Sequence, residues 1–412
     1  MSANRSQSLV IETRRGADAL SLSLMLFMAV NSVAISLMPV VTNELQDRFA
    51  FTSSQIGLLT STYMVAFALG ALPMGLVAAR LGGRTLALGA VLLVAGGVLF
   101  AFSSSYPWFL VGRFLQGLGG ATIIPVCNPL MAHAISKRCH DRALGIFGAG
   151  HGLGVVAALL ILPSIQQAGG YRAAFLTSAG IAVVIGLVAL TQRPVRARPS
   201  HPEEAVSFVG LMRGVGAVAV NRRLLLLILV NIGVMAIVVG LLAWTPLFLH
   251  DQRGTSLSVA AYLTAGVGVA QIIGNLAGAA AMSRWGKPFV LAVGMGVMFL
   301  ATALVPFVPG FVLVFACVTV AGFLTMAVFP AIIGSVAEVV DRPEQIGPAT
   351  GFLNLTNIVG TWFAPWLFGV LLDSYGTAPG RSGYLLGYML LALFPFLGTL
   401  AAVVYMGRRA PA

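Results

Sequence analysis

Long stretches without Asp, Glu, Lys or Arg constrain the fold of this chain more than any other feature. One helix needs about 20 predominantly apolar residues to cross the hydrocarbon core of a bilayer. Charge-free stretches of that length or more make up almost the whole chain, and they cover residues 19–43, 49–79, 85–112, 114–136, 143–171, 173–192, 224–250, 254–283, 288–337, 345–372 and 382–407. The sequence therefore predicts a protein that crosses a membrane many times.

Composition supports the same class. Hydrophobic residues make up 58% of the 412 residues and charged residues only 9%, whereas a soluble domain carries about 25% charged residues. A membrane β-barrel would need segments of about ten residues with alternating polarity. The continuous runs of Leu, Val, Ala and Gly do not alternate, so we predict an all-α membrane protein.

The number of spans follows from the breaks within these runs. Run 288–337 is too long for one helix and contains Pro306, Pro309 and Gly310, which predict two helices and a tight turn. Arg113 interrupts what otherwise reads as one helix. We therefore expect twelve transmembrane helices. The longest polar interruption, 193–223, divides them into a six-helix bundle at 1–192, a central loop and a second six-helix bundle at 224–412.

Basic residues predict the orientation. Of the 24 Lys and Arg residues, four lie in loops predicted to face outside (Arg48, Arg172, Arg253 and Arg381) and Arg113 lies in a span, which leaves 19 for the cytoplasmic segments. We expect a multi-pass protein of a bacterial inner (plasma) membrane with both termini in the cytoplasm. Topology then accounts for the net charge of +12, and no nucleic-acid partner is needed.

Matching residues recur at an offset near 205. Arg80-Leu81-Gly82 corresponds to Arg284-Trp285-Gly286, Gly154 to Gly360, and His151 to Asn357. Internal repeats of this kind place the substrate site of a transporter at the interface between the halves, near the midplane of the bilayer.

The sequence also resembles a known family. The twelve spans, the long central loop, the segment 75–84 (GLVAARLGGR) after the second span and the segment 113–119 (RFLQGLG) in the fourth are similar to the major facilitator superfamily. The resemblance covers nearly the whole chain. It implies two bundles that rock around a central cavity and expose it alternately to each side.

The resemblance also implies a gate in the loop after span 2 and in its repeat. Its residues are Gly75, Arg80, Gly82, Arg84, Arg284 and Gly286. Gly75 would permit close helix packing, and Arg80 lies where a helix C-terminus favours cations. The family usually has an acidic residue directly before this arginine, but this chain has Ala79 there and Ser283 in the repeat, so a charged latch should be weakened or rebuilt from other contacts. The alternative is a plain turn with positive-inside arginines.

Two ionisable residues inside the predicted spans are candidates for function. A charge in a membrane is costly and marks a functional site by default. Arg113 could bind an anionic substrate or take part in coupling, as the family resemblance implies for this motif, or it could be structural and bond Gln116 or backbone carbonyls. His151 could carry a proton or bind an anion, or be a neutral side chain bonded to a neighbouring helix. It lies among Gly145, Gly148, Gly150, Gly152 and Gly154, which would let this helix pack closely.

Uncharged polar side chains at the depth of a cavity are the other candidates. They are Asn31, Tyr63, Gln116, Asn128, Asn231, Trp244, Gln271, Asn275, Asn354 and Asn357. Each could contact substrate or join two helices. All twelve acidic residues lie in loops or at helix ends, which weighs against a proton-driven exporter of cationic drugs, because such a protein normally buries a carboxylate.

These observations favour a secondary active transporter for a small neutral or anionic organic solute, working by alternating access, with protons as a candidate coupling ion. The chain has no phosphate-binding loop, zinc motif or nucleophile elbow, so we expect no enzyme activity, cofactor or metal. The alternative is an exporter of apolar drugs or metabolites; a membrane receptor or membrane-bound enzyme ranks lower. Expected partners are the substrate and membrane lipid, and we expect a monomer.

Overall fold

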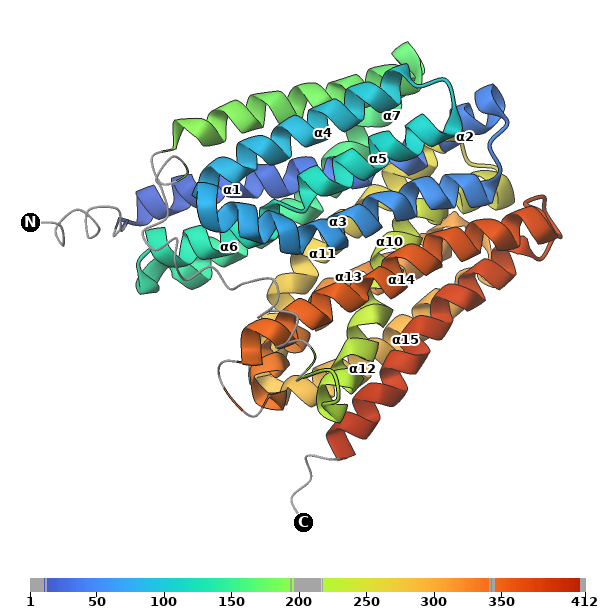
Figure 1. Ribbon diagram of the computed structural model, residues 1–412. Coiled ribbons are helices and arrows are strands. Elements are labelled where there is room, and N and C mark those ends of the chain that lie inside the picture. Colours follow the sequence, from blue (N-terminus) through green and yellow to red (C-terminus); the bar gives the residue numbers. More distant parts are fainter. Residues whose placement is uncertain are drawn as a thin grey trace, which may run out of the picture.

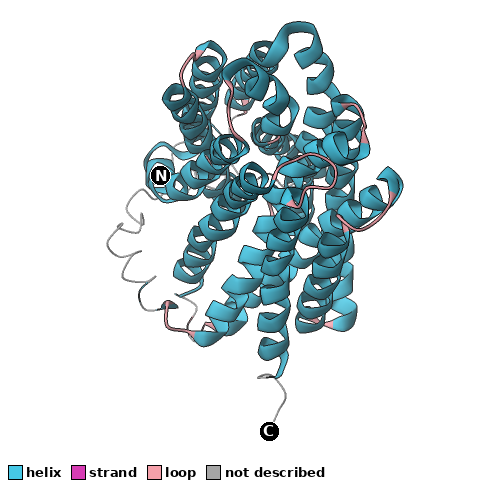
Figure 2. Cartoon of the chain, turned by 90° about the vertical axis from the view of Figure 1, so that its right-hand side faces the viewer, coloured by secondary structure: helices cyan, strands magenta, loops and turns pink. Residues whose placement is uncertain are grey.

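The computed structural model describes residues 11, 13–192, 195, 216, 218–340, 342 and 345–407. Within these residues the chain is helical, with short connections (Figure 2) and a single isolated bridge between Ile11 and Ile135. The all-α fold class is confirmed. The helices are α1 (Arg14–Ile35), α2 (Leu37–Phe49), α3 (Ser53–Leu81), α4 (Thr85–Phe102), α5 (Tyr106–Gly120), α6 (Ile123–Ala134), α7 (Lys137–Thr191), α10 (Arg222–Arg253), α11 (Leu257–Trp285), α12 (Lys287–Leu304), α13 (Gly310–Val339), α14 (Ile346–Tyr375) and α15 (Gly383–Gly407).

Ten helical stretches of the described chain are long and apolar enough to cross a membrane. Two of them, Ser53–Phe102 and Arg142–Val188, contain 50 and 47 residues, more than twice the roughly 20 that one crossing needs. A 3-10 turn at Gly82–Arg84 breaks the first stretch, and Figure 1 shows the chain reversing between α3 and α4. Gly170, with φ +70°, interrupts the second stretch inside α7. A reversal at each break would give the twelve predicted crossings.

The predicted interruptions fall close to the observed ones. α12 ends at Leu304 and α13 begins at Gly310, as Pro306, Pro309 and Gly310 predict. Arg113, in contrast, lies inside a continuous helix. The fourth predicted span is interrupted at Ala121 and Thr122, between α5 and α6.

The predicted repeat is found in the positions where helices end. Helices α3 and α11 both contain 29 residues, and α4 and α12 both contain 18. Three pairs of helix ends have a positive φ, a conformation that favours glycine: Ala50 and Gly254, 204 residues apart; Gly82 and Gly286, also 204 apart; and Gly170 and Gly376, 206 apart. These offsets agree with the value near 205 that the sequence predicts.

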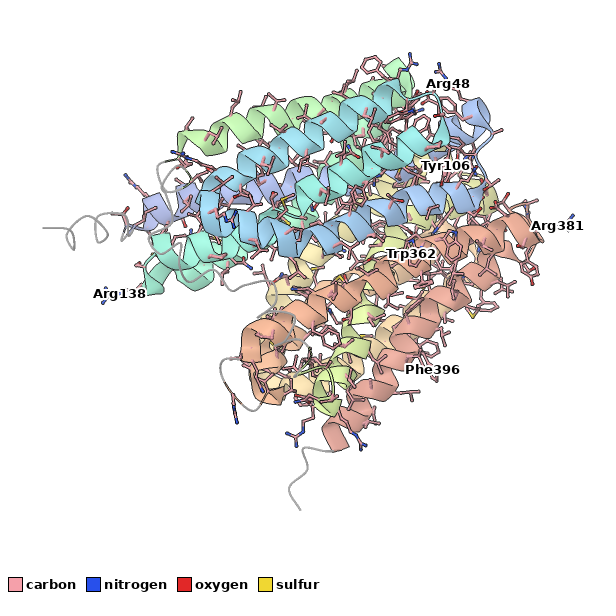
Figure 3. The ribbon with its side chains drawn as sticks, in the orientation of Figure 1. Arg48, Tyr106, Arg138, Trp362, Arg381 and Phe396 are labelled. Carbon is pink, nitrogen blue, oxygen red and sulfur yellow. The ribbon has the colours of Figure 1, made fainter. Side chains whose placement is uncertain are left out.

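The two halves of the chain form separate groups of helices. Figure 1 shows α1–α7, in blue to green, above α10–α15, in yellow-green to red. The helices that pack across the boundary are chiefly α3 on α14 and α7 on α11. Arg48 and Arg381 lie at one end of the molecule and Arg138 at the other (Figure 3), as the predicted orientation requires. Most of the central loop 193–223 lies outside the described residues.

Candidate functional site

Arg113 on α5 is held by backbone carbonyls. Its side chain is fully buried, and Nη1 donates to the carbonyl oxygen of Ala34 at 2.8 Å and to Gln116 Oε1 at 2.9 Å. Nε donates to the carbonyl oxygen of Leu59 at 3.3 Å. The guanidinium carbon lies 4.7 Å from the centre of the Tyr63 ring, whose negative face attracts a cation. These are the partners expected of a structural arginine, yet Nη2 is buried without a hydrogen-bond partner among the described residues.

Tyr63 and Asn31 extend this network. The Tyr63 hydroxyl donates to Asn31 Oδ1 at 2.6 Å, and both side chains are buried. Because Asn31 lies on α1, Tyr63 on α3, and Arg113 with Gln116 on α5, one polar network joins three helices of the first half. The structure confirms the contact between Arg113 and Gln116 that the sequence suggests, and it adds Tyr63 and Asn31, which the sequence suggests only separately.

His151 on α7 is bonded to α1. Its Nδ1 lies 2.8 Å from Ser32 Oγ, and the same hydroxyl donates to the carbonyl oxygen of Met28 at 3.1 Å. A serine hydroxyl has one hydrogen. When Ser32 donates that hydrogen to the carbonyl oxygen of Met28, the imidazole must donate from Nδ1 to Ser32 Oγ. His151 Nε2 is then an acceptor, and it is buried with no hydrogen-bond partner in the described part of the chain.

A matching polar pair lies in the second half. Asn231 Nδ2, on α10, donates to Asn357 Oδ1 and to the carbonyl oxygen of Leu353, both on α14. Asn357 is the repeat counterpart of His151, and α10 occupies the place of α1. Each half therefore joins its first helix to its fifth predicted span through a partly buried polar contact, and only the pair in the first half contains a titratable group.

The remaining polar candidates differ in their surroundings. Trp244 Nε1 donates to the carbonyl oxygen of Pro365 at 3.1 Å, and its ring stacks on Phe368 with centres 5.2 Å apart. Gln271 is 1% exposed, and neither its Nε2 nor its Oε1 has a hydrogen-bond partner among the described residues. An unpaired buried amide costs about 1–3 kcal/mol, so Gln271 points to a ligand or water. Asn354 and Asn275 are half-buried, and Asn128 is exposed.

The glycines of α7 allow close packing on two helices. A Cβ on Gly150 or Gly154 would meet the backbone of Met25 or Ala29 on α1, and a Cβ on Gly152 would meet Gly268 on α11. Gly75 has no comparably close neighbour in this structure. A Cβ there would find only the Pro125 side chain, at an ordinary 3.7 Å.

The predicted gate residues form turns without a charged latch. Gly82 and Gly286 have φ values of 61° and 79° and end α3 and α11. Arg80, Arg84 and Arg284 are exposed, and within the described ranges none of them forms an ion pair. This agrees with the missing acidic residues at Ala79 and Ser283. Among the described residues, a latch between the halves is found elsewhere.

Such a latch lies at the opposite end of α3. Asp373, near the end of α14, accepts hydrogen bonds from the backbone N–H groups of Ser53 and Ser54 at 2.7 and 2.8 Å. These N–H groups are at the N-terminus of α3, where the helix dipole favours a negative charge. One carboxylate of the second half thus caps a helix of the first. Thr52 to Gln55 read as a capping box, but no sequence signal pairs that box with Asp373.

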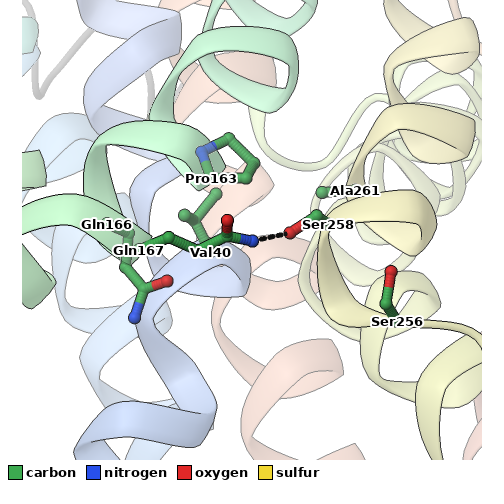
Figure 4. Close-up of a pocket in the computed structure, with 7 residues that line it drawn as sticks. All are labelled: Val40, Pro163, Gln166, Gln167, Ser256, Ser258 and Ala261. Carbon is green, nitrogen blue, oxygen red and sulfur yellow. Dashed lines mark hydrogen bonds between the residues drawn. The ribbon is translucent and has the colours of Figure 1, made fainter.

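The same end of the molecule holds the other hydrogen bonds between the halves. Ser61 Oγ donates to the carbonyl oxygen of Trp362 at 2.7 Å, and Trp362 lies at the boundary in Figure 3. Gln167 on α7 donates to Ser258 on α11, beside a cavity of about 250 Å³ (Figure 4). Ser164 on α7 and Tyr262 on α11 add a further hydrogen bond between the halves.

Comparison with known proteins decides the family. The model described as Major Facilitator Superfamily matches residues 20–309 and 251–412, which together span nearly the whole chain. The chain belongs to the major facilitator superfamily. The family resemblance seen in segments 75–84 and 113–119 is therefore confirmed.

Its superfamily relatives include transporters and a sensor. The probable 4-methylmuconolactone transporter of Cupriavidus pinatubonensis is 27% identical over 55% of this chain, and the match spans about half (54%) of that relative's length. The gentisate transporter of Corynebacterium glutamicum is 25% identical over 81% of this chain and 76% of its own. The membrane sensor protein UhpC of Escherichia coli is 24% identical over 86% of each.

A solved structure has the same superfamily fold. A bacterial homolog to the human lysosomal transporter Spinster, in an inward-facing and unoccupied conformation, has a TM-score of 0.76 and 19% identity, covering 97% of this chain and all of that one. The family match and these relatives identify a multi-pass membrane protein of a superfamily that includes transporters, and none of the proteins compared above is an enzyme.

Proposed function

We propose that this protein is a secondary active transporter of a small organic anion, with two six-helix halves that give alternating access. The observation that carries the proposal is the chemistry of the buried polar groups. Arg113 Nη2 and Gln271 Nε2 are buried donors without a partner in the described structure, whereas the charge-free runs contain no Asp or Glu. Unpaired donors without acidic neighbours suit a carboxylate better than a cation.

The relatives support the same substrate class. Gentisate is an aromatic carboxylate, and the gentisate transporter aligns with four-fifths of this chain. A neutral solute would leave the charge of Arg113 unused, and a purely apolar drug would leave Gln271 unpaired as well. We therefore propose an anion that also carries uncharged polar groups.

A second function is favoured by one comparison. UhpC, named a membrane sensor, matches this chain over 86% of both lengths. A sensor of this fold would bind its anion and report the event without net movement of solute. Flux, rather than binding, separates the two functions.

The test measures binding and flux on the same purified protein. Binding to the folded state raises the melting temperature, so a panel of aromatic and sugar carboxylates, their methyl esters and cationic amines is first screened by thermal shift. The best carboxylate is then followed in proteoliposomes by counterflow. We expect stabilisation by carboxylates alone, together with flux. Stabilisation by amines would refute the anion proposal, and binding without flux would favour the sensor.

Proton coupling, which we also propose, predicts a specific effect at His151. Imidazole titrates near pH 6.5 in water, and glutamine keeps hydrogen bonding but loses titration. His151→Gln should abolish accumulation driven by a proton gradient and retain counterflow. Ser32→Ala is the control, because it removes the 2.8 Å contact and leaves the imidazole. If His151→Gln accumulates substrate with the wild-type pH profile, the histidine is structural.

The proposed orientation is tested by cysteine labelling in a cysteine-free background. Positions 200, 285 and 410 should react from the cytoplasm and position 378 from outside, because the positive-inside rule places the basic loops inside. Trp285 is the last residue of α11 and precedes the turn at Gly286, so a cysteine there lies at the end of a span, next to the aqueous phase. Positions 200 and 410 lie outside the described residues. One position that reacts only from the opposite face would overturn the topology.

A further inference from the structure

An apolar groove runs between α11, α12 and α13 at the Arg284 end of the second half. Its volume is about 450 Å³, and small side chains such as Ala277, Ala280 and Gly294 form much of its lining. The helices that pack against α12 are α10, α11, α13 and α15, all from the same half. The groove therefore belongs to the outer surface of one bundle and not to the boundary where the two halves meet.

The residues around the groove face the membrane. Trp285 is 58% exposed, and Phe289 and Val293 are each 46% exposed. Exposed apolar side chains on a spanning helix face lipid, because water is excluded from the hydrocarbon core. Trp285 marks the level of the interface, where tryptophan is enriched. An occupant of this groove must therefore be apolar along its length and polar at the Trp285 end.

Arg284 lies at that polar end and has no ion pair within the described part of the chain. It lines the groove, and its guanidinium carbon lies 5.6 Å from the Trp285 ring centre. The neighbouring cation, Lys287, is already engaged, since its Nζ lies 2.7 Å from Glu338 Oε1 and 2.7 Å from the carbonyl oxygen of Gly334. The planar donors of Arg284 suit the oxygens of a phosphate.

We propose that this groove binds one anionic phospholipid of the cytoplasmic leaflet, with an acyl chain between α11, α12 and α13 and the phosphate on Arg284. The groove supplies the apolar contact and Arg284 the charge complementarity, and basic pockets between spans on the cytoplasmic side commonly hold anionic head groups. The α11–α12 turn contains the predicted gate residues Arg284 and Gly286, so the lipid would also brace this turn.

The first half offers a matched control. Arg80 occupies the repeat position of Arg284, is also exposed and also ends a helix, but Leu81 stands where the second half has Trp285. A general attraction of anionic lipid to cytoplasmic arginines would act on both positions. A specific site formed by the groove and Arg284 would depend on Arg284 and not on Arg80.

The experiment counts bound lipid by native mass spectrometry of the full-length protein, titrated with phosphatidylglycerol or phosphatidylcholine of identical chains. We expect Arg284→Gln to weaken phosphatidylglycerol binding at least tenfold, to the level of phosphatidylcholine. Ala280→Phe, an exposed position that fills the groove, should weaken both lipids, and Arg80→Gln should change neither. Glycerol phosphate, which lacks acyl chains, should not compete at equal concentration.

Three results would overturn the proposal. Equal losses in Arg80→Gln and Arg284→Gln would indicate diffuse attraction to positive charge. Full competition by glycerol phosphate would indicate an anion site without an acyl groove. Unchanged binding in both Arg284→Gln and Ala280→Phe would place the bound lipid elsewhere. Because Arg284 and Ala280 are exposed, neither substitution removes a buried contact, and each variant is expected to fold.

Discussion

Replacing Arg113 with alanine should abolish transport and destabilise the protein by roughly 2–4 kcal/mol, because it leaves a cavity and removes the partner of Gln116. The fully buried guanidinium bonds to α1, α3 and α5. Its loss therefore removes hydrogen bonds that join three helices of the first half. Thermal unfolding in detergent measures the loss of stability, and counterflow measures the loss of transport. This variant alone does not distinguish a structural arginine from one that binds substrate.

Arg113→Lys makes that distinction. Lysine keeps the charge but lacks the planar fork, so it cannot hold the carbonyls and also present a free nitrogen to an anion. We expect a folded protein whose carboxylate affinity falls at least about tenfold, on the order of 1.4 kcal/mol. Arg253→Lys is the matched control, because Arg253 also bonds a carbonyl, that of Val308 at 2.8 Å, and lies 5.1 Å from the Phe248 ring centre. Unchanged carboxylate affinity in Arg113→Lys would leave Arg113 a purely structural role.

Asp373→Asn should shift the protein toward a conformation that is open at the Asp373 end. The substitution removes the charge that caps α3 across the two halves. A charge at a helix N-terminus together with its hydrogen bonds contributes about 1–2 kcal/mol at an exposed position. The equilibrium between the two conformations should therefore change by a factor of roughly 5–30.

Distances between spin labels at the two ends of the halves measure this shift. They should lengthen at the Asp373 end and shorten at the Arg138 end. Asp251→Asn is the control: Asp251 Oδ2 accepts from the Tyr384 hydroxyl at 2.6 Å, but both residues belong to the second half. If both variants shift the distances equally, loss of any carboxylate at this end suffices and the latch has no special role.

The helices were the part most open to prediction from sequence. Most charge-free runs end close to the end of a helix, since a charge inside a bilayer is costly. Run 85–112 is an exception, because it continues past Phe102, where α4 ends, into α5. Proline and glycine located the gap between α12 and α13. The offset near 205 recurs in the positive φ angles of Gly82 and Gly286, because both positions need the conformation that glycine adopts without strain.

The contacts of the candidate site could not be predicted in the same way. A helix in lipid is apolar on every side, so its sequence does not reveal which face packs against protein. The carbonyl oxygens of Ala34 and Leu59 that hold Arg113 have no sequence signature, because every residue has such a group. Ser32 and Asp373 looked ordinary for the same reason: each gains its importance from a partner far away in the chain.

The boundary between α3 and α14 has a mechanical consequence. Gly57 lies directly on the carbonyl of Pro365, and Gly369 lies on that of Ser53, so bare backbone meets bare backbone where most helix pairs interlock their side chains. Van der Waals contact holds spans that approach this closely, and two such surfaces can slide and part without pulling side chains out of one another's grooves. The α3–α14 boundary therefore permits sliding, and the hydrogen bonds of Asp373 to the N-terminus of α3 hold it in one position. A methyl group added at Gly57 or Gly369 would clash with the facing backbone. Such a substitution should block the movement of the two halves, and with it transport, before it unfolds the protein.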